Sequence, residues 1–283
     1  MATTVESAEH DGSGFGSMST AGKVRFTAFT LVALAIIAVN LAMTPAYLLA
    51  APITGWFQDL GVHQVHDMTV GTLIWLAFVV PMALMLYHPT DRVNAVLAPL
   101  VAAGSIAVMA LLAGSFLFEG FAVGSVLALV ALVLHPAGRS LVRFDRVESI
   151  DRRVAGLFVV GAVPLLAYAG LEVGKQVGPA DEHVAFVHYG GMAVVAVLVV
   201  LMGTLAVLRR RDWRFAAWSA GVMAAFVGLA SAVYPASASS VGTVAGALLV
   251  LWAVAFVAGV EYVRRGRTGS ESGSLDETAT GPA

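Results

Sequence analysis

Residues 184–208 read VAFVHYGGMAVVAVLVVLMGTLAVL and contain no Asp, Glu, Lys or Arg. An α-helix rises about 1.5 Å per residue, so an uncharged apolar run of this length can cross the roughly 30 Å hydrocarbon core of a bilayer. Three consecutive arginines, Arg209 to Arg211, follow directly. The segment therefore predicts a transmembrane helix that ends in a basic, water-facing turn.

Further stretches of the same kind lie on both sides of this one. They occur at about 26–50, 68–87, 93–117, 121–138, 154–172, 215–234 and 241–261. Charged side chains occur in them only near their ends, as Glu172 and Glu261, because an unpaired charge is costly in hydrocarbon. The chain is 59% hydrophobic and 12% charged, with a mean hydropathy of +0.85, so it has too few polar side chains for a soluble globule. We therefore expect an all-α integral membrane protein with about eight transmembrane helices.

The basic residues predict how these helices are oriented. Fifteen of the sixteen lysines and arginines fall on alternate loops and at the two ends, and only Lys175 falls on an opposite loop. By the positive-inside rule, the arginine-containing loops and both termini lie on the cytoplasmic side of a cell membrane. The acidic segment 1–22 and the polar segment 265–283 are predicted to be disordered tails.

An internal repeat is indicated by two similar helix starts. Val65-His66-Asp67-Met68 opens the second predicted helix, and Val187-His188-Tyr189-Gly190 opens the sixth. Each of these helices ends in an arginine-containing turn. We expect two four-helix halves at 23–138 and 154–264, joined by an arginine-rich cytoplasmic linker at 139–153.

Histidines and carboxylates gather at the outer ends of the second and sixth helices. Neutral imidazole is a common ligand of haem iron, zinc and copper, and a nearby carboxylate can fix its tautomer. We predict that His66 and His188 bind a cofactor between them, with haem or copper as the candidates. The wider set of candidate metal ligands is His63, His66, Asp67, Glu182, His183 and His188. The alternative interpretation is that these side chains only mark helix ends at the headgroup level.

Other metal chemistry is limited by composition. The chain has no cysteine, which excludes disulfides, thiolate metal sites and iron–sulfur clusters. His88 and His135 are each followed by proline at a predicted cytoplasmic helix end. Since proline stops a helix and histidine is favourable beside a helix C-terminus, we interpret this second pair as structural.

Two resemblances to known families concern the same regions. Segments 44–47 and 67–75 resemble the C-terminal helix pair of membrane-bound cytochrome oxidase assembly factors. Asp67, Gly71 and Trp75 match the family motif, and a methionine follows Asp67 where that family has glutamine. The resemblance implies a role next to respiratory oxidase subunits.

The plan of two four-helix halves, each with a histidine opening its second helix, is similar to haem A synthases. In that family an arginine usually follows each such histidine, whereas Asp67 and Tyr189 follow His66 and His188 here. The family's outward-side histidines of the fourth and eighth helices are missing, because the fourth helix has only the inward-side His135 and the eighth has none. The loop cysteines common in that family are also absent, so its two-haem mechanism is not carried over.

These patterns leave three functional classes open. The first is a membrane protein of respiratory haem or copper handling, with the lipid bilayer, oxidase subunits or copies of itself as partners and no nucleic acid. The second is a transporter or permease subunit for a small neutral or lipid-like substrate, since coupled transporters normally have an ionisable residue at mid-membrane and none is found here. The third is a membrane hydrolase with a zinc-bound water, so the sequence leaves open whether the chain is an enzyme.

Overall fold

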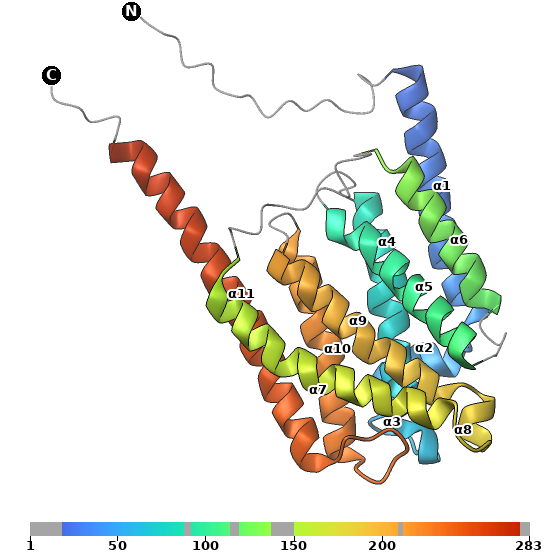
Figure 1. Cartoon of the computed structure of the whole chain (residues 1–283). Coiled ribbons are helices and arrows are strands. Elements are labelled where there is room, and N and C mark those ends of the chain that lie inside the picture. Colours follow the sequence, from blue (N-terminus) through green and yellow to red (C-terminus); the bar gives the residue numbers. More distant parts are fainter. Residues whose placement is uncertain (1–18, 88–91, 114–118, 137–149, 209–211, 278–283) are drawn as a thin grey trace, which may run out of the picture.

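The structure of the chain is a computed structural model that describes residues 19–87, 92–113, 119–136, 150–208 and 212–277. Within these residues the fold is all-helical (Figure 1). The helices are α1 (Thr20–Met43), α2 (Ala46–Thr54), η2 (Gly61–His63), α3 (Gln64–Ile74), η3 (Trp75–Val79), α4 (Val80–Tyr87), α5 (Val93–Ala113), α6 (Glu119–Leu134), α7 (Arg152–Gln176), α8 (Glu182–Ala185), α9 (His188–Leu208), α10 (Trp213–Val233) and α11 (Thr243–Glu277).

In the described part of the chain, seven helical segments are long and apolar enough to cross a membrane. They are Thr20–Met43, Gly61–Tyr87, Asn94–Ala113, Arg152–Gln176, His188–Leu208, Trp213–Val233 and Thr243–Arg264. The predicted all-α, multi-pass membrane class is thereby confirmed. The stretch predicted at 121–138 overlaps α6, whose described apolar part, Val123–Leu134, is shorter than a full span. The count of eight spans and the division into two repeats stay predictions.

Two proline positions shape the first spans. The predicted single helix at 26–50 is interrupted at Thr44, which is extended with ψ of 130°, because a residue before proline is driven out of the helical region. α2 then starts behind Pro45 as a separate short helix. Further along, the π-helical turn Trp75–Val79 comes just before Pro81, whose missing N–H cannot donate to the preceding turn.

α9 lies at the centre of the bundle, which explains why it has no polar face. It packs against α3, α5, α7 and α10, and most of its residues are buried. Its first turn therefore lies beside the first turn of α3, although the two are far apart in the sequence. This contact brings together the two predicted histidine-bearing helix ends.

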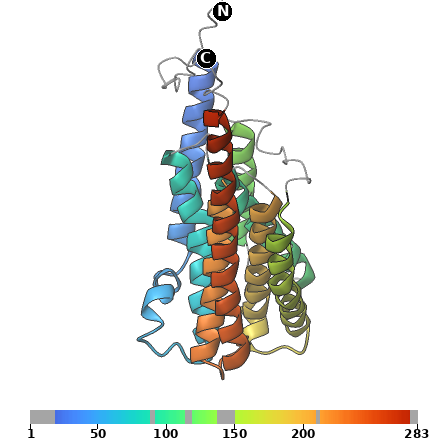
Figure 2. The same cartoon turned by 90° about the vertical axis from the view of Figure 1, so that its left-hand side faces the viewer.

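The two views of the bundle agree on where its ends lie. α1 starts and α11 ends at the same end of the bundle, and α8 lies at the opposite end (Figures 1 and 2). The histidine-bearing starts of α3 and α9 lie at the α8 end. The chemistry is thus gathered at the end of the bundle away from the start of α1.

Lys175 is the one Lys or Arg among the described residues at the α8 end of the bundle, and it pairs with an acid of its own helix. Its Nζ lies 2.6 Å from Oε1 of Glu172, whose side chain is fully buried. The hydroxyl of Ser239 donates to the other carboxylate oxygen of Glu172. A buried carboxylate requires such partners, so this pair secures the end of α7 against the loop before α11.

At the other end, Asp212 ties the two halves of the chain together. Its Oδ2 accepts the backbone N–H groups of Asn94 and Ala95 at 3.0 and 3.2 Å, in the first turn of α5. Arg92 donates to its Oδ1 at 3.4 Å. Burial raises the pKa of Asp212 to about 6, against the opposing effects of Arg92 and the two N–H groups.

Candidate metal centre

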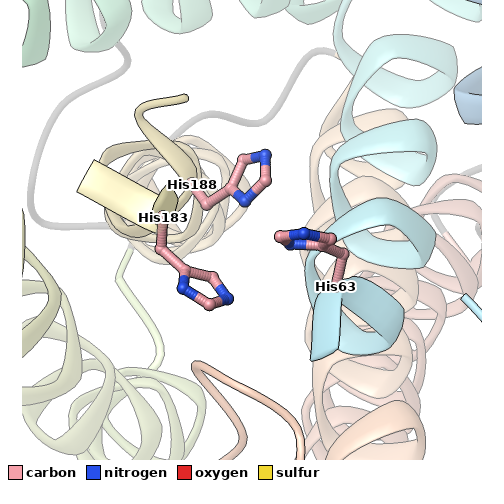
Figure 3. Close-up of side chains that lie close together, drawn as sticks. All are labelled: His63, His183 and His188. Atoms are coloured by element: carbon pink, nitrogen blue, oxygen red, sulfur yellow. The ribbon is translucent and has the colours of Figure 1, made fainter. Parts of the chain in front are cut away.

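Three histidines point toward one another at the α8 end of the bundle (Figure 3). One ring nitrogen each of His63, His183 and His188 lies within 4.8 Å of the other two. The ring centroids are 4.5 Å apart for His63 and His188, 4.9 Å for His63 and His183, and 5.7 Å for His183 and His188. They come from η2, α8 and α9, so the cluster forms only when the two halves of the chain pack together.

A tight turn presents His63. Gly61 has a φ of +61°, a left-handed conformation that glycine adopts without strain, and its N–H donates to Oδ1 of Asp59 at 2.8 Å. The chain then enters η2, which ends at His63 directly before α3. Local backbone geometry therefore aims this imidazole at the start of α9.

The neighbouring side chain of Gln64 fixes that turn from inside. It is buried, and its amide nitrogen donates to the carbonyls of Gly55 and Gln58, while its oxygen accepts the N–H of Leu60. The loop between α2 and α3 is thus held by one amide. Moving this side chain away would leave three backbone groups without their hydrogen-bond partner. Gln64 is a positioning residue for His63 that we did not predict from the sequence.

A second glutamine performs the equivalent task for the other two histidines. Gln176, at the end of α7, donates to the carbonyl of Val184 and accepts the N–H of Gly190, both at 2.9 Å. It joins α8 to the first turn of α9. Between them lies Val187, a β-branched residue at φ of +57°, a conformation that is strained for such a side chain and that sets the direction of His188.

Three buried ring nitrogens of the cluster have no hydrogen-bond partner among the described residues. They are Nδ1 of His63, Nε2 of His183 and Nδ1 of His188. A buried polar atom without a partner is costly, and native structures rarely leave one without a reason. A metal ion bound by these rings would remove that cost.

Asp181 lies behind His183. Its Oδ2 is 4.0 Å from Nδ1 of that ring, and the pKa of Asp181 is below its usual value, chiefly because the N–H of Val184 donates to the carboxylate. An ionised carboxylate facing Nδ1 favours a proton there and leaves Nε2 as an electron-pair donor. The unpartnered nitrogen of His183 is therefore the one suited to bind a metal.

His66 adjoins the cluster but has a partner of its own. Its Nδ1 lies 2.8 Å from Oδ1 of Asp67, and its ring centroid is 4.1 Å from that of His188, with an interplanar angle of 32°. The side chains of His66 and Asp67 are both about nine-tenths buried. Glu182 is exposed and lies outside the group of three.

The structure therefore brings five of the six candidate residues to one place, as three grouped histidines and an adjoining His66–Asp67 pair. Of the second predicted pair, His135 is buried against the ring of Phe29 at the end of α6, and His88 lies outside the described residues.

Comparison with protein-family models, with curated proteins and with solved structures finds no match for this chain. Its function is therefore argued from the site itself. Fold and geometry define a multi-pass membrane protein with a partly buried histidine cluster at one end of its helix bundle.

Proposed function

We propose that this membrane protein binds one transition-metal ion through His63, His183 and His188. Two observations carry the proposal: histidines from three separate elements place one ring nitrogen each within reach of the other two, and each ring has a buried nitrogen without a hydrogen-bond partner among the described residues. Nitrogens bound to one ion at about 2.0–2.1 Å lie about 3.4 Å apart in tetrahedral geometry. The three nitrogens, within 4.8 Å of one another, would need to approach by up to about 1.4 Å to bind one ion in this geometry.

The ligand chemistry favours zinc or copper. Imidazole suits both ions, and the chain has no thiolate to offer. Three protein ligands leave a fourth position open for water or a substrate, as in catalytic rather than structural zinc sites. The site thus supports either reaction chemistry or the transfer of an ion at the membrane surface.

An ion is favoured over haem by the spacing of the rings. His66 and His188 are the pair that we predicted to bind a group between them, but their ring centroids are only 4.1 Å apart. That separation leaves no room for a porphyrin and its iron between the two rings as they lie. We therefore propose a metal ion, zinc or copper, rather than haem as the cofactor.

We further propose that the site lies at the outer face of a cell membrane, with both termini in the cytoplasm and two four-helix halves. The support is the alternation of basic loops and the position of the cluster away from the start of α1. The resemblance to oxidase assembly factors and haem A synthases makes handling of respiratory copper the role to test first, beside oxidase subunits or a second copy of the chain.

Elemental analysis of the purified protein tests the metal assignment. After loading with zinc or copper and exhaustive dialysis, we expect one ion per chain in the wild type and in Glu182→Gln, which alters an exposed neighbour. His63→Ala, His183→Ala and His188→Ala should each lose most of the metal, since an ion held by two imidazoles exchanges readily. A wild type that retains no metal, or a His183→Ala variant that retains all of it, contradicts the proposal.

A further inference from the structure

A cavity of about 340 Å³ adjoins the metal centre at His188. Its polar lining comes from His188, His66, Asp67 and the hydroxyl-bearing Tyr47, and the remainder is mostly apolar, including Leu73. Small-molecule sites commonly have this composition, in which a few convergent polar groups lie in an apolar pocket. The cavity extends from the histidine cluster between α3, α9 and the start of α2.

The atoms of His66 make one corner of this cavity a hydrogen-bond acceptor. Because its Nδ1 lies 2.8 Å from the Asp67 carboxylate, the proton of the neutral ring resides on Nδ1, and Nε2 carries a lone pair. Nε2 makes no hydrogen bond to the described residues, and Gly191 of α9 lies beside it. A Cβ at Gly191 would lie 3.1 Å from Nε2 and crowd it, so glycine at this position keeps that side of the nitrogen free of a side chain.

Exposed and mostly apolar side chains form the rim of the cavity. Met43, Tyr47 and Phe186 line the cavity and are each exposed by 60% or more. Exposed apolar side chains at the end of a transmembrane bundle are solvated by the bilayer, and tyrosine is favoured at this depth. A molecule dissolved in the membrane can reach His66 along this rim.

We propose that the cavity binds a small, lipid-soluble molecule with a hydroxyl head group. The O–H donates to Nε2 of His66, and the apolar body lies against Leu73 and the other aliphatic residues of the lining. Binding itself is independent of the metal, whereas the position of the head group beside the ion rests on the function proposed above. An alcohol or phenol fits, because the acceptor nitrogen requires a donor and no Lys or Arg lines the cavity among the described residues.

Equilibrium dialysis of detergent-solubilised protein against empty micelles tests this site, with 2-naphthol and its methyl ether as probes. We expect 2-naphthol to bind at one molecule per chain and the ether, which cannot donate, to bind at least about tenfold more weakly. In His66→Phe, which keeps a ring but removes the acceptor, the preference for naphthol should fall to within about twofold. Val70→Trp, which fills the cavity, should abolish binding of both probes.

His183→Ala separates the two proposals, because it should lose metal yet keep the preference for naphthol. Equal binding of the two probes by the wild type would overturn the inference, and so would unchanged binding in Val70→Trp. Each variant is compared only after its thermal transition shows that it is folded. An absence of metal from the wild type with a retained preference for naphthol would contradict the metal centre alone.

Discussion

At the scale of single residues, the site combines three histidine rings that can bind a metal with two glutamine amides that hold the surrounding backbone in place. His63 and His183 are on loops or short helices, where side chains move easily unless the backbone is secured. Gln64 and Gln176 secure it: Gln64 bonds backbone groups of the loop before His63, and Gln176 bonds backbone groups on both sides of His188. Such preorganisation is what allows a metal to be bound without first ordering its ligands.

Replacing Gln176 tests this role. Gln176→Leu removes the bonds to Val184 and Gly190 and frees α8 from α9, so we expect metal affinity to fall by about 10- to 100-fold, as is typical for residues that orient ligands. The measurement is a competition titration with a chelator. Asn40→Leu is the matched control, since Asn40 is a buried amide of α1 whose side chain, among the described residues, donates within its own helix to Ile36. Equal affinity in the wild type and Gln176→Leu would show that the amide does not position the site.

The sequence draws attention to the histidines but gives no reason to single out the two glutamines. An imidazole in an apolar chain is conspicuous because few other side chains bind metals. Gln176 gives no such signal, since an amide after Lys175 at a helix end looks like an ordinary polar cap. Its importance depends on Val184 and Gly190 lying within its reach, which is a property of the folded chain.

At the scale of helices, close approach depends on small residues. A Cβ added to Gly246 of α11 would lie 2.9 Å from the backbone nitrogen of Ala232 and also contact the carbonyl of Gly228 in α10. Small residues facing each other in this way allow membrane helices to pack without any hydrophobic driving force between them. The contact fixes α10 against α11.

Gly246→Ala should therefore destabilise the protein by about 1–3 kcal/mol, because the backbone it meets cannot move aside cheaply. Gly170→Ala, on α7 where an added Cβ meets nothing within 4 Å, should be neutral or stabilising by up to about 1 kcal/mol. Unfolding by SDS in mixed micelles measures both. A Gly246→Ala variant as stable as Gly170→Ala would mean that α10 and α11 are not this close.

The bond between Asp212 and the start of α5 predicts a pH dependence. Its pKa of about 6 exceeds the ordinary 3.8, so between these values the folded chain binds more protons at this group than the unfolded chain does. The contribution of Asp212 to stability is fully present below about pH 4 and is lost as the pH rises through about 6, by up to about 3 kcal/mol.

Asp212→Asn isolates this contribution, since asparagine cannot ionise and tolerates the left-handed backbone at φ of 52°. The stability of the wild type relative to the variant, from thermal unfolding in detergent, should fall between pH 4 and pH 7. A difference that stays constant across this range would contradict the raised pKa.

The length of the uncharged stretches predicted the helices, but it did not predict where the helices are interrupted. The predicted helix at 26–50 breaks at Pro45, although a proline inside a membrane helix is often tolerated. Whether it breaks or bends the helix depends on partners for the freed backbone groups, which hydropathy does not report. α2 consequently folds back beside α3 and supplies part of the cavity wall.

At the scale of the whole molecule, a role at the outer face of the membrane requires that the α8 end of the bundle lies outside the cell. The chain has no cysteine, so single cysteines can be introduced without a background. Ala180→Cys, exposed between α7 and α8, should react with a membrane-impermeant maleimide in intact cells, whereas Ser19→Cys, exposed before α1, should react only after lysis. The opposite labelling pattern would place the histidine cluster in the cytoplasm.

The assignment of the site as a metal centre is tested most directly by X-ray absorption at the zinc edge of the zinc-loaded protein. We expect three imidazole nitrogens at about 2.0–2.1 Å and one further light ligand, as three histidines and an open position require. The triple variant of His63, His183 and His188 to alanine should lose this spectrum. A shell of oxygen atoms alone in the wild type, or an imidazole signal that survives in the triple variant, would show that these histidines do not hold the ion.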